Sequence, residues 1–220
     1  MTITIDPIIK ETLPNILLGG FIIDVEVGSS SAELMKLLAE GITELEPKLT
    51  PESIREMETV KANKNAYRAL GKDPNRYRPS AEALLRRVAN GKGLYPINNV
   101  VDILNLISVK TGYSICGYDF DKIEGDVVMG KGRNAEPYEG IGRGELNIEN
   151  LPTFRDALGA FGTPTSDSVR TMVSDATKRF LMIIIGFEGK AKIEHALDEA
   201  SSLLQQYASG KEQDRLFVSA

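Results

Sequence analysis

The sequence contains little of the chemistry that disulfides and metal centres require. Its 220 residues include one cysteine, Cys116, one histidine, His195, and no tryptophan. One cysteine excludes an intramolecular disulfide, and so few ligands exclude the cysteine-rich and multi-histidine sites that bind zinc. We therefore expect no metal site and no cofactor. We interpret Cys116 as a small buried hydrophobe and His195 as a solvated helix residue, rather than as a nucleophile pair.

Long hydrophobic runs are also missing. The longest, residues 180–185, is about a third of the length that spans a membrane. Residues 1–6 lack the basic stretch and the apolar core of a signal peptide. The sequence thus predicts a cytosolic (cytoplasmic) protein that has no membrane partner.

Charge is distributed unevenly along the chain. The 26 basic and 31 acidic residues give a net charge of −5. Residues 55–92 nevertheless hold ten Lys and Arg against four Asp and Glu, leaving 16 basic and 27 acidic residues elsewhere. Because contact with a polyanion depends on local potential, this segment fits either a solvated helix or a surface for nucleic acid.

Helix and strand patterns occur in clusters rather than in strict alternation, which favours an α+β domain. Strands are predicted where β-branched residues dominate, and helices where apolar residues recur at helical spacing behind a capping residue. The predicted strands are 2–5, 16–27 and 179–187, and the helices are 31–45, 50–70, 80–88 (capped by Ser80), 99–112 and 191–207. We expect short strands within 113–138, loops at 72–79 and 159–167, and a loose tail over the last ten residues.

Three polar side chains form a stripe on the helix predicted at 99–112, namely Asn98, Asp102 and Asn105. Leaving such a group buried and unpaired costs roughly 1–3 kcal/mol, so each needs a partner or a polar cavity. We expect Asn98 and Asp102 to cap helices and hold the adjoining loops. Asn105, farther along the helix, is the better candidate for a pocket.

A second polar feature is the hydroxyl-rich segment that contains Thr163, Thr165, Ser166 and Ser168. Turns of this composition commonly cap themselves through their own backbone. The same hydroxyl groups could instead bind a carboxylate, an amine or a ribose. The sequence leaves both interpretations open.

Two motifs in the middle of the chain resemble a known family. Residues 97–102 read Ile-Asn-Asn-Val-Val-Asp and are followed by Asn105, and residues 118–123 read Tyr-Asp-Phe-Asp-Lys-Ile. Together they resemble the B3/B4 editing module of the phenylalanyl-tRNA synthetase beta subunit. The Arg86-Arg87 helix before them and the 159–166 loop after them fall in the family's order, so the resemblance covers about residues 77–187.

The resemblance implies a layered α+β domain that binds the aminoacylated end of tRNA and hydrolyses a wrongly attached tyrosine. It also suggests a free-standing relative of that module, because nothing resembles the catalytic core that attaches amino acids. We accordingly expect one domain over 1–220, with an N-terminal strand and helical part at 1–75, a B3/B4-like core at 76–190, and a closing helix and tail at 191–220.

The family's binding residues can be matched to positions in this sequence. Asn105 matches the family's asparagine on the central helix, and Arg87 matches its arginine on the preceding helix. Cys116 stands where the family has a histidine, and a family glutamate falls near Pro164 or Thr165, so two polar groups of the family's pocket are absent. The residues expected to bind substrate are Arg87, Asn105, Cys116, Tyr118, Thr165 and Ser166.

Three functions follow from the resemblance and the charge pattern. The chain could deacylate mischarged tRNA in trans, with hydroxyls of Thr165 and Ser166 at the ester oxyanion. It could instead bind an amino acid or a tRNA end without chemistry, or serve as a protein-interaction domain with a vestigial pocket. We expect tRNA or aminoacyl-tRNA as partner, with a free amino acid possible and no DNA. The expected RNA-facing residues are Lys61, Lys64 and Arg68.

Overall fold

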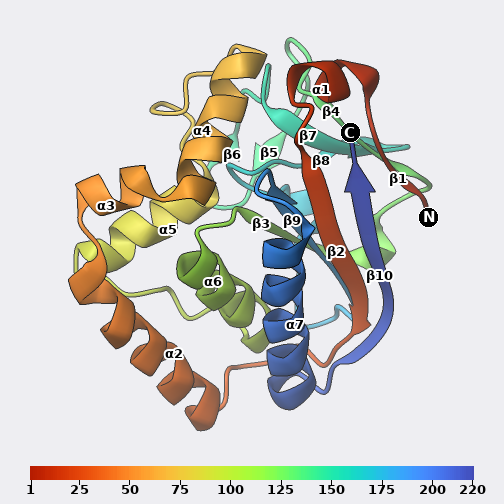
Figure 1. The fold of residues 1–220 in the computed structure, drawn as a ribbon. Coiled ribbons are helices and arrows are strands. Elements are labelled where there is room, and N and C mark those ends of the chain that lie inside the picture. Colours follow the sequence, from red (N-terminus) through yellow and green to blue (C-terminus); the bar gives the residue numbers. More distant parts are fainter.

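The computed structural model describes residues 1–220 and is organised around one strand, β9 (Arg179–Gly186), whose two faces are both apolar. Alternate side chains of a strand point to opposite faces, so this continuous apolar run supplies two different cores. Phe180, Met182 and Ile184 belong to one core, and the odd-numbered residues 181–185 belong to the other. The strand predicted at 179–187 is confirmed, and it lies at the centre of the molecule (Figure 1).

β9 lies in the first of two four-stranded sheets. The order of this sheet is β10-β2-β9-β3, where β10 is Lys211–Ser219, β2 is Leu17–Asp24 and β3 is Ile115–Asp119. Every pair of neighbours in it is antiparallel. The sheet therefore joins segments from the two ends and the middle of the chain.

The second sheet packs on the first and has the order β1-β4-β7-β8. Its strands are β1 (Ile3–Ile5), β4 (Val127–Lys131), β7 (Pro152–Asp156) and β8 (Gly159–Gly162). β1 pairs with β4 in parallel, and the other pairs are antiparallel. The segment expected as an N-terminal part, 1–75, thus contributes one strand to each sheet.

The core between the two sheets contains an aromatic cluster. The Tyr118 ring of β3 stands at a right angle to Phe161 of β8, with 4.9 Å between ring centroids, and Phe154 of β7 lies next to both. All three side chains are completely buried. These contacts attach β3 to the second sheet from its inner face.

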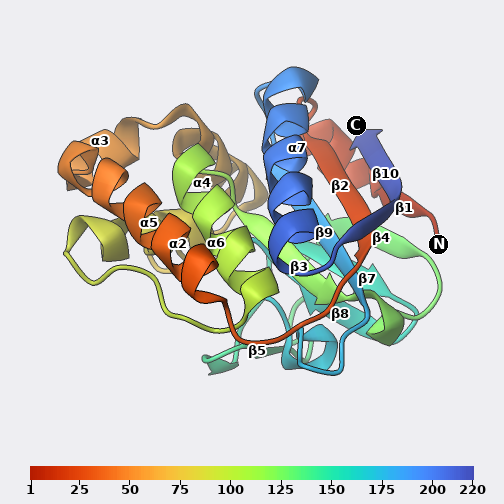
Figure 2. The same ribbon diagram turned by 90° about the horizontal axis from the view of Figure 1, so that it is seen from below.

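Helices cover the outer face of the first sheet, as Figure 2 shows. They are α6 (Asn99–Thr111), α7 (Lys190–Tyr207) and α2 (Ala32–Leu45), and their apolar sides form one core with β2, β3 and β9. A short helix, α1 (Pro7–Thr12), connects β1 to β2. The layers are helices, sheet and sheet, so the expected layered α+β fold is confirmed.

Three further helices lie beside the layers, namely α3 (Pro51–Glu56), α4 (Glu58–Leu70) and α5 (Ser80–Ala89). The single helix expected over 50–70 is wrong, because Met57 adopts an extended conformation with φ −57° and ψ 126°. The break lets the Thr59 hydroxyl donate to the Thr111 carbonyl at the end of α6, 3.1 Å away. No helix in the structure has the length and apolar character needed to cross a membrane.

Other local expectations are corrected by tertiary contacts. The last ten residues are no loose tail, because β10 pairs with β2 and its Leu216 and Phe217 pack against opposite cores. The 159–167 loop begins instead as β8, where Phe161 fills the core between the sheets. Ser80 is the first residue of α5 rather than its cap, and no side chain caps that helix.

The contact of β2 with β9 generates a stability prediction. A Cβ atom at Gly20 would lie 2.4 Å from the Met182 carbonyl oxygen, a backbone atom that cannot move aside. We expect Gly20→Ala to lower the free energy of unfolding by about 1–3 kcal/mol through overpacking. Chemical denaturation measures the change. Gly28→Ala, where a Cβ meets no atom within 4 Å, is the control, and equal losses in both variants would contradict this packing argument.

Candidate functional site

The hydroxyl-rich segment forms a tight turn at residues 163–168, between β8 and the short 3-10 helix η3 (Val169–Thr171). The Thr163 hydroxyl donates to the Ser166 carbonyl at 3.0 Å and accepts the N–H groups of Thr165 and Ser166 at 3.3 and 3.2 Å. The turn therefore caps itself, as its composition predicts. Thr163 and Thr165 are buried, whereas Ser166 is partly exposed.

Side chains from distant elements hold this turn. The Tyr67 hydroxyl of α4 lies 2.9 Å from Thr165 Oγ1, and the Tyr138 hydroxyl donates to the Ser166 carbonyl at 2.7 Å. The Ser80 N–H at the start of α5 donates to the Pro164 carbonyl at 2.8 Å. The helical part and the sheets thus meet at the turn.

Two residues of β3 lie directly beneath the turn. Cys116 and Tyr118 alternate with Gly117 and point into the core between the sheets. The Cys116 thiol lies 3.8 Å from the Thr163 carbonyl oxygen, and the Gly117 N–H donates to Asp167 Oδ2 at 3.1 Å. Cys116, Tyr118, Thr165 and Asp167 therefore form one buried polar cluster with Tyr67 and Tyr138.

The cluster contains two polar atoms without partners. The Tyr118 hydroxyl and Asp167 Oδ1 are both inaccessible to solvent and lack a hydrogen bond of good geometry, although the two groups lie close enough for each to shift the pKa of the other. Each unpaired buried group costs about 1–3 kcal/mol, and buried polar groups in native proteins are nearly always paired. Two such atoms next to one turn lower the free energy of unfolding, and proteins commonly accept such a loss at binding and catalytic sites.

Burial changes the acid–base chemistry of the cluster. Loss of hydration raises the pKa of Asp167 to about 7, although the hydrogen bond from the Gly117 N–H lowers it in part. Burial, with the Asp167 carboxyl beside it, raises the pKa of the Cys116 thiol well above its usual value. The thiol is thus held protonated, which is the opposite of what a nucleophile needs. His195 lies exposed on α7, on the other side of the first sheet from Cys116.

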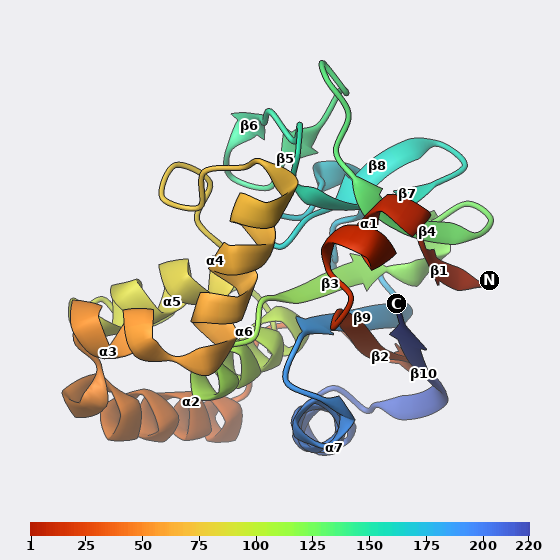
Figure 3. The same cartoon turned by 45° about the horizontal axis from the view of Figure 1, so that its top comes forward.

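A small hairpin covers the outside of the turn. It consists of β5 (Glu139–Gly140) and β6 (Gly144–Glu145), and Figure 3 shows it beside α4. The Ile141 N–H donates to the Asp167 carbonyl at 2.9 Å, and Gly140 bridges to Ser168. Arg143 at the tip of the hairpin is exposed, and its charge is close enough to oppose the rise in the pKa of Tyr67 that burial causes.

A cleft of about 550 Å³ opens beside the hairpin and the turn. Its wall includes Tyr138, Ser168 and the exposed acids Glu139 and Glu145. These two acids are direct cross-strand partners in the hairpin. Like charges placed opposite each other destabilise a strand pair, so the cleft favours a cationic group between them.

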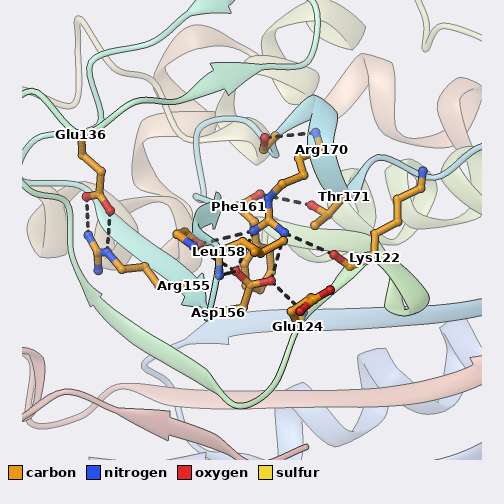
Figure 4. Close-up of polar contacts among 11 residues, drawn as sticks. Lys122, Glu124, Glu136, Arg155, Asp156, Leu158, Phe161, Arg170 and Thr171 are labelled. Atoms are coloured by element: carbon orange, nitrogen blue, oxygen red, sulfur yellow. Dashed lines mark hydrogen bonds and ion pairs between the residues drawn. The ribbon is translucent and has the colours of Figure 1, made fainter.

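Ion pairs fix the far side of the cleft, as Figure 4 shows. The Arg170 guanidinium of η3 binds both carboxylate oxygens of Asp156 at 2.8 and 3.0 Å. Arg155 binds both oxygens of Glu136 at 2.6 and 2.7 Å. Bidentate pairs of this kind are geometrically specific, so η3 and the turn before it have a fixed position on the β7–β8 hairpin. No group of three or more His, Cys, Asp or Glu side chains is placed to hold a metal ion.

Arg87 and Asn105 lie away from this cluster. Arg87, near the end of α5, donates to the Lys92 carbonyl at 3.0 Å and stacks on the Tyr95 ring. Asn105 is partly exposed on α6 and forms no side-chain hydrogen bond. α6 covers the face of β3 opposite to Cys116, as the approach of Leu104 to Gly117 shows. The two stripe residues before Asn105 do cap and hold loops: Asn98 accepts the Val101 N–H, and Asp102 accepts the Ile97 N–H.

The expected RNA-facing residues have different environments. Lys61 and Arg68 are exposed on α4. Lys64 is only 8% exposed and lies 3.3 Å from the Glu82 carboxylate of α5. The expected exposure of Lys64 is not found, because its charge neutralises a buried acid and ties α4 to α5. A contact of Lys61 or Arg68 with RNA stays a prediction.

Sequence reasoning missed Tyr67, Tyr138 and Asp167 as residues of the site. Tyr67 and Tyr138 stand in segments without any motif, and 71 positions separate them. Asp167 stands between two serines in the hydroxyl-rich segment. An acid in that setting is typical of an exposed turn, so the sequence gives no signal that this carboxyl is buried.

The fold and site define a layered α+β domain that presents a polar turn beside a cleft. Comparison with known families gives its identity: the model of the B3/4 domain matches residues 62–209. The chain belongs to the B3/4 domain family. The resemblance inferred from its motifs is confirmed.

The similar proteins are subunits of one enzyme. The phenylalanine–tRNA ligase beta subunit of Streptococcus agalactiae serotype Ia is 40% identical in an alignment of 163 residues that covers 60% of this chain and 20% of that subunit. The corresponding subunit of Moorella thermoacetica is 31% identical over 111 residues, 49% of this chain and 14% of that subunit. The chain thus spans at most a fifth of the curated relatives it matches.

One solved structure is also similar. It is an N-terminal fragment of the phenylalanyl-tRNA synthetase beta subunit from Pyrococcus horikoshii. The match covers 99% of this chain and 50% of the fragment, with 14% sequence identity and a TM-score of 0.47.

The raised pKa of Asp167 predicts how stability depends on pH. The folded protein keeps a proton up to about pH 7 that the unfolded chain loses near pH 3.8, so the free energy of unfolding falls as pH rises through this interval. Asp167→Asn cannot ionise, so we expect it to remove this fall and to be more stable than the native protein at pH 8. Denaturation at several pH values measures it.

Asp156→Asn is the matched control. Hydrogen bonds from Arg170 and from backbone N–H groups outweigh the effect of burial and lower the pKa of Asp156. Its contribution is present at neutral pH and is lost as pH falls, so this variant should be destabilised at pH 7 and approach the native protein in acid. An Asp167→Asn profile parallel to the native one would show that Asp167 is ionised in the folded state.

Proposed function

We propose that this domain binds the aminoacylated end of a tRNA, with the ester at the 163–168 turn and the amino acid in the adjoining cleft. The observation that carries the proposal is the cleft itself, whose wall joins the turn at Ser168 to the opposed acids Glu139 and Glu145 of the hairpin that carries the exposed Arg143. The curated relatives are beta subunits of phenylalanine–tRNA ligases, which are named for tRNA. Membership of the B3/4 family therefore supports a tRNA-related role.

Cations around the turn suit the phosphates of an RNA strand. Arg143 lies on the hairpin, and Arg76 and Arg78 lie on the loop that leads into α5, all three exposed. Lys72 holds this loop against the segment after the hairpin by donating to the carbonyl oxygens of Asn147 and Glu149 at 2.9 and 2.7 Å. Arg78 lies 3.8 Å from Glu82, while Arg76 and Arg143 form no ion pair.

The cleft suits the other end of the ligand. An aminoacyl ester carries a free α-ammonium group next to its carbonyl. The opposed carboxylates of Glu139 and Glu145 provide acceptors and negative charge for such a group. Ser168, in the wall of the same cleft, adds a hydroxyl group. The arginines would bind phosphate while the acids bind the ammonium, so the site is complementary to both charges of an aminoacylated RNA end.

Deacylation is a second candidate function, and Asp167 is the observation that favours it. A carboxyl group with a pKa of about 7 suits a general base at neutral pH. The carboxylate would take a proton from water, and the water oxygen would attack the ester carbonyl. The bond between the carbonyl carbon and the ribose oxygen would then break, and that oxygen would take up the proton. The partly exposed Ser166 hydroxyl would donate to the oxyanion.

The binding proposal predicts a specific effect on salt dependence. We expect Arg143→Ala to weaken tRNA binding and to reduce the slope of log K against log salt concentration by about 0.7–0.9, the value of one phosphate contact. Arg76→Ala should act similarly, and Arg68→Ala tests the α4 surface in the same assay. Lys211→Ala, an exposed residue on β10, is the control. An unchanged slope in the Arg143 and Arg76 variants would contradict this RNA surface.

Deacylation is tested by release of amino acid from a panel of charged tRNAs. If the domain hydrolyses an ester, we expect Asp167→Asn to lower the rate constant by about 10²–10⁴-fold, the usual contribution of a general base, with tRNA binding retained. Lys211→Ala should keep the native rate. Release that persists in the Asp167 variant would contradict the role of this carboxyl, and loss in Cys116→Ala alone would indicate thiol chemistry. Binding without release from any tRNA would leave a non-catalytic module.

A further inference from the structure

Tyr95 exposes an aromatic face that is rigidly supported from behind. It lies in the loop between α5 and α6, and 60% of its surface is accessible to solvent. The Arg87 guanidinium stacks on one face of the ring, 3.4 Å from the centroid. Arg87 also donates to the Lys92 carbonyl at 3.0 Å, which ties the same loop to the helix. The opposite face of the ring is left for a ligand.

Cations, apolar groups and acids all lie near this ring. Arg87 belongs to the stack, and Lys92 is exposed three residues before Tyr95. The ring also lines an apolar groove with Met35, Leu38 and Ile42. Two acids lie at the loop, because Glu46 is near Gly91 and Asp102 accepts the Ile97 N–H. An exposed aromatic ring backed by a guanidinium is an arrangement on which unpaired bases stack.

The position of Tyr95 relative to the 163–168 turn is also informative. The first residue of α5, Ser80, holds the Pro164 carbonyl of the turn, while Arg87 and the Tyr95 stack lie at the other end of the helix. A helix of this length, ten residues, separates its ends by about 15 Å. Figure 1 shows α5 in yellow, running from the neighbourhood of the hairpin towards α3. A single strand that ends at the turn can therefore follow α5 to Tyr95.

We propose that Tyr95, supported by Arg87, is a stacking platform for an unpaired base near the 3′ end of the bound tRNA. The proposal rests on the proposed function, because it takes the position of the terminal nucleotide from the turn. The ligand class is single-stranded RNA, bound through a base face and through a phosphate at Lys92. A protein partner on the exposed Tyr95 and its apolar neighbours Met35 and Ile97 is the alternative that the experiment separates.

The test combines protein variants with two RNAs, an intact tRNA and the same tRNA without its unpaired 3′ nucleotides. Tyr95→Ala should weaken binding of the intact tRNA on the order of 5- to 100-fold, the effect of losing one stacked base, without changing the salt slope. Tyr95→Phe should bind as the native protein does, because it keeps the ring. Lys92→Ala should instead reduce the slope by about 0.7.

The shortened RNA decides whether the base stacks. With it, Tyr95→Ala and the native protein should bind equally, because the stacked nucleotide is gone. Ile8→Ala, an exposed apolar residue on α1, is the control and should match the native protein with both RNAs. Thermal unfolding of each variant separates a loss of folding from a loss of contact.

Two results would overturn the platform while leaving the proposed function in place. Tyr95→Ala could bind the intact tRNA as tightly as the native protein while Arg143→Ala binds weakly, which would show that the Tyr95 face does not contact RNA. Tyr95→Ala could also weaken both RNAs equally, which would show that the ring does not contact the 3′ end. A different result would contradict the proposed function itself: the native protein would bind neither the intact nor the shortened tRNA.

Discussion

The burial of β9 on both faces is the constraint on which the rest of the structure depends. Its apolar side chains can leave water only if a layer covers each face of the sheet. Helices cover one face and a second sheet covers the other. As a result β3, the neighbour of β9, has an inner face as well, and Cys116 and Tyr118 point into the space between the sheets. The location of the site follows from this burial.

The site combines strong anchoring with incomplete hydrogen bonding. Tyr67, Tyr138 and the Ser80 N–H bind three successive residues of the turn, and Arg170 fixes the segment after it. The same surroundings leave the Tyr118 hydroxyl and Asp167 Oδ1 buried without a hydrogen bond of good geometry. Rigid support around the turn is what a binding site requires, because a ligand then binds without having to order the protein. α5 extends this support towards Tyr95, since one helix end contacts the turn and the other carries the Arg87 stack.

Local patterns in the sequence predicted most of the regular structure. Capping residues and helical spacing gave α2, α6 and α7, and the apolar run at 180–185 gave β9. The motifs around Asn98 and Tyr118 gave the family, and composition gave the self-capping turn. In contrast, β10 was missed and a loose tail expected, because its three consecutive apolar residues, 216–218, are too short a run to indicate a strand without β2 beside them. The break at Met57 likewise depends on Thr59 reaching α6.

The sequence by itself determined the α+β class, the family and two parts of the site, the hydroxyl turn and the strand with Cys116 and Tyr118. Those features depend on neighbours within a few positions, whose spacing the chain displays directly. Only the tertiary structure decided that Tyr67, Tyr138 and Asp167 join them, that Lys64 is buried against Glu82, and that Asn105 lies across β3 from Cys116. These outcomes depend on which face of an element is covered and by which distant segment. The spacing of residues along the chain does not show which segment covers a given face, because the layers pack through residues that are far apart in sequence.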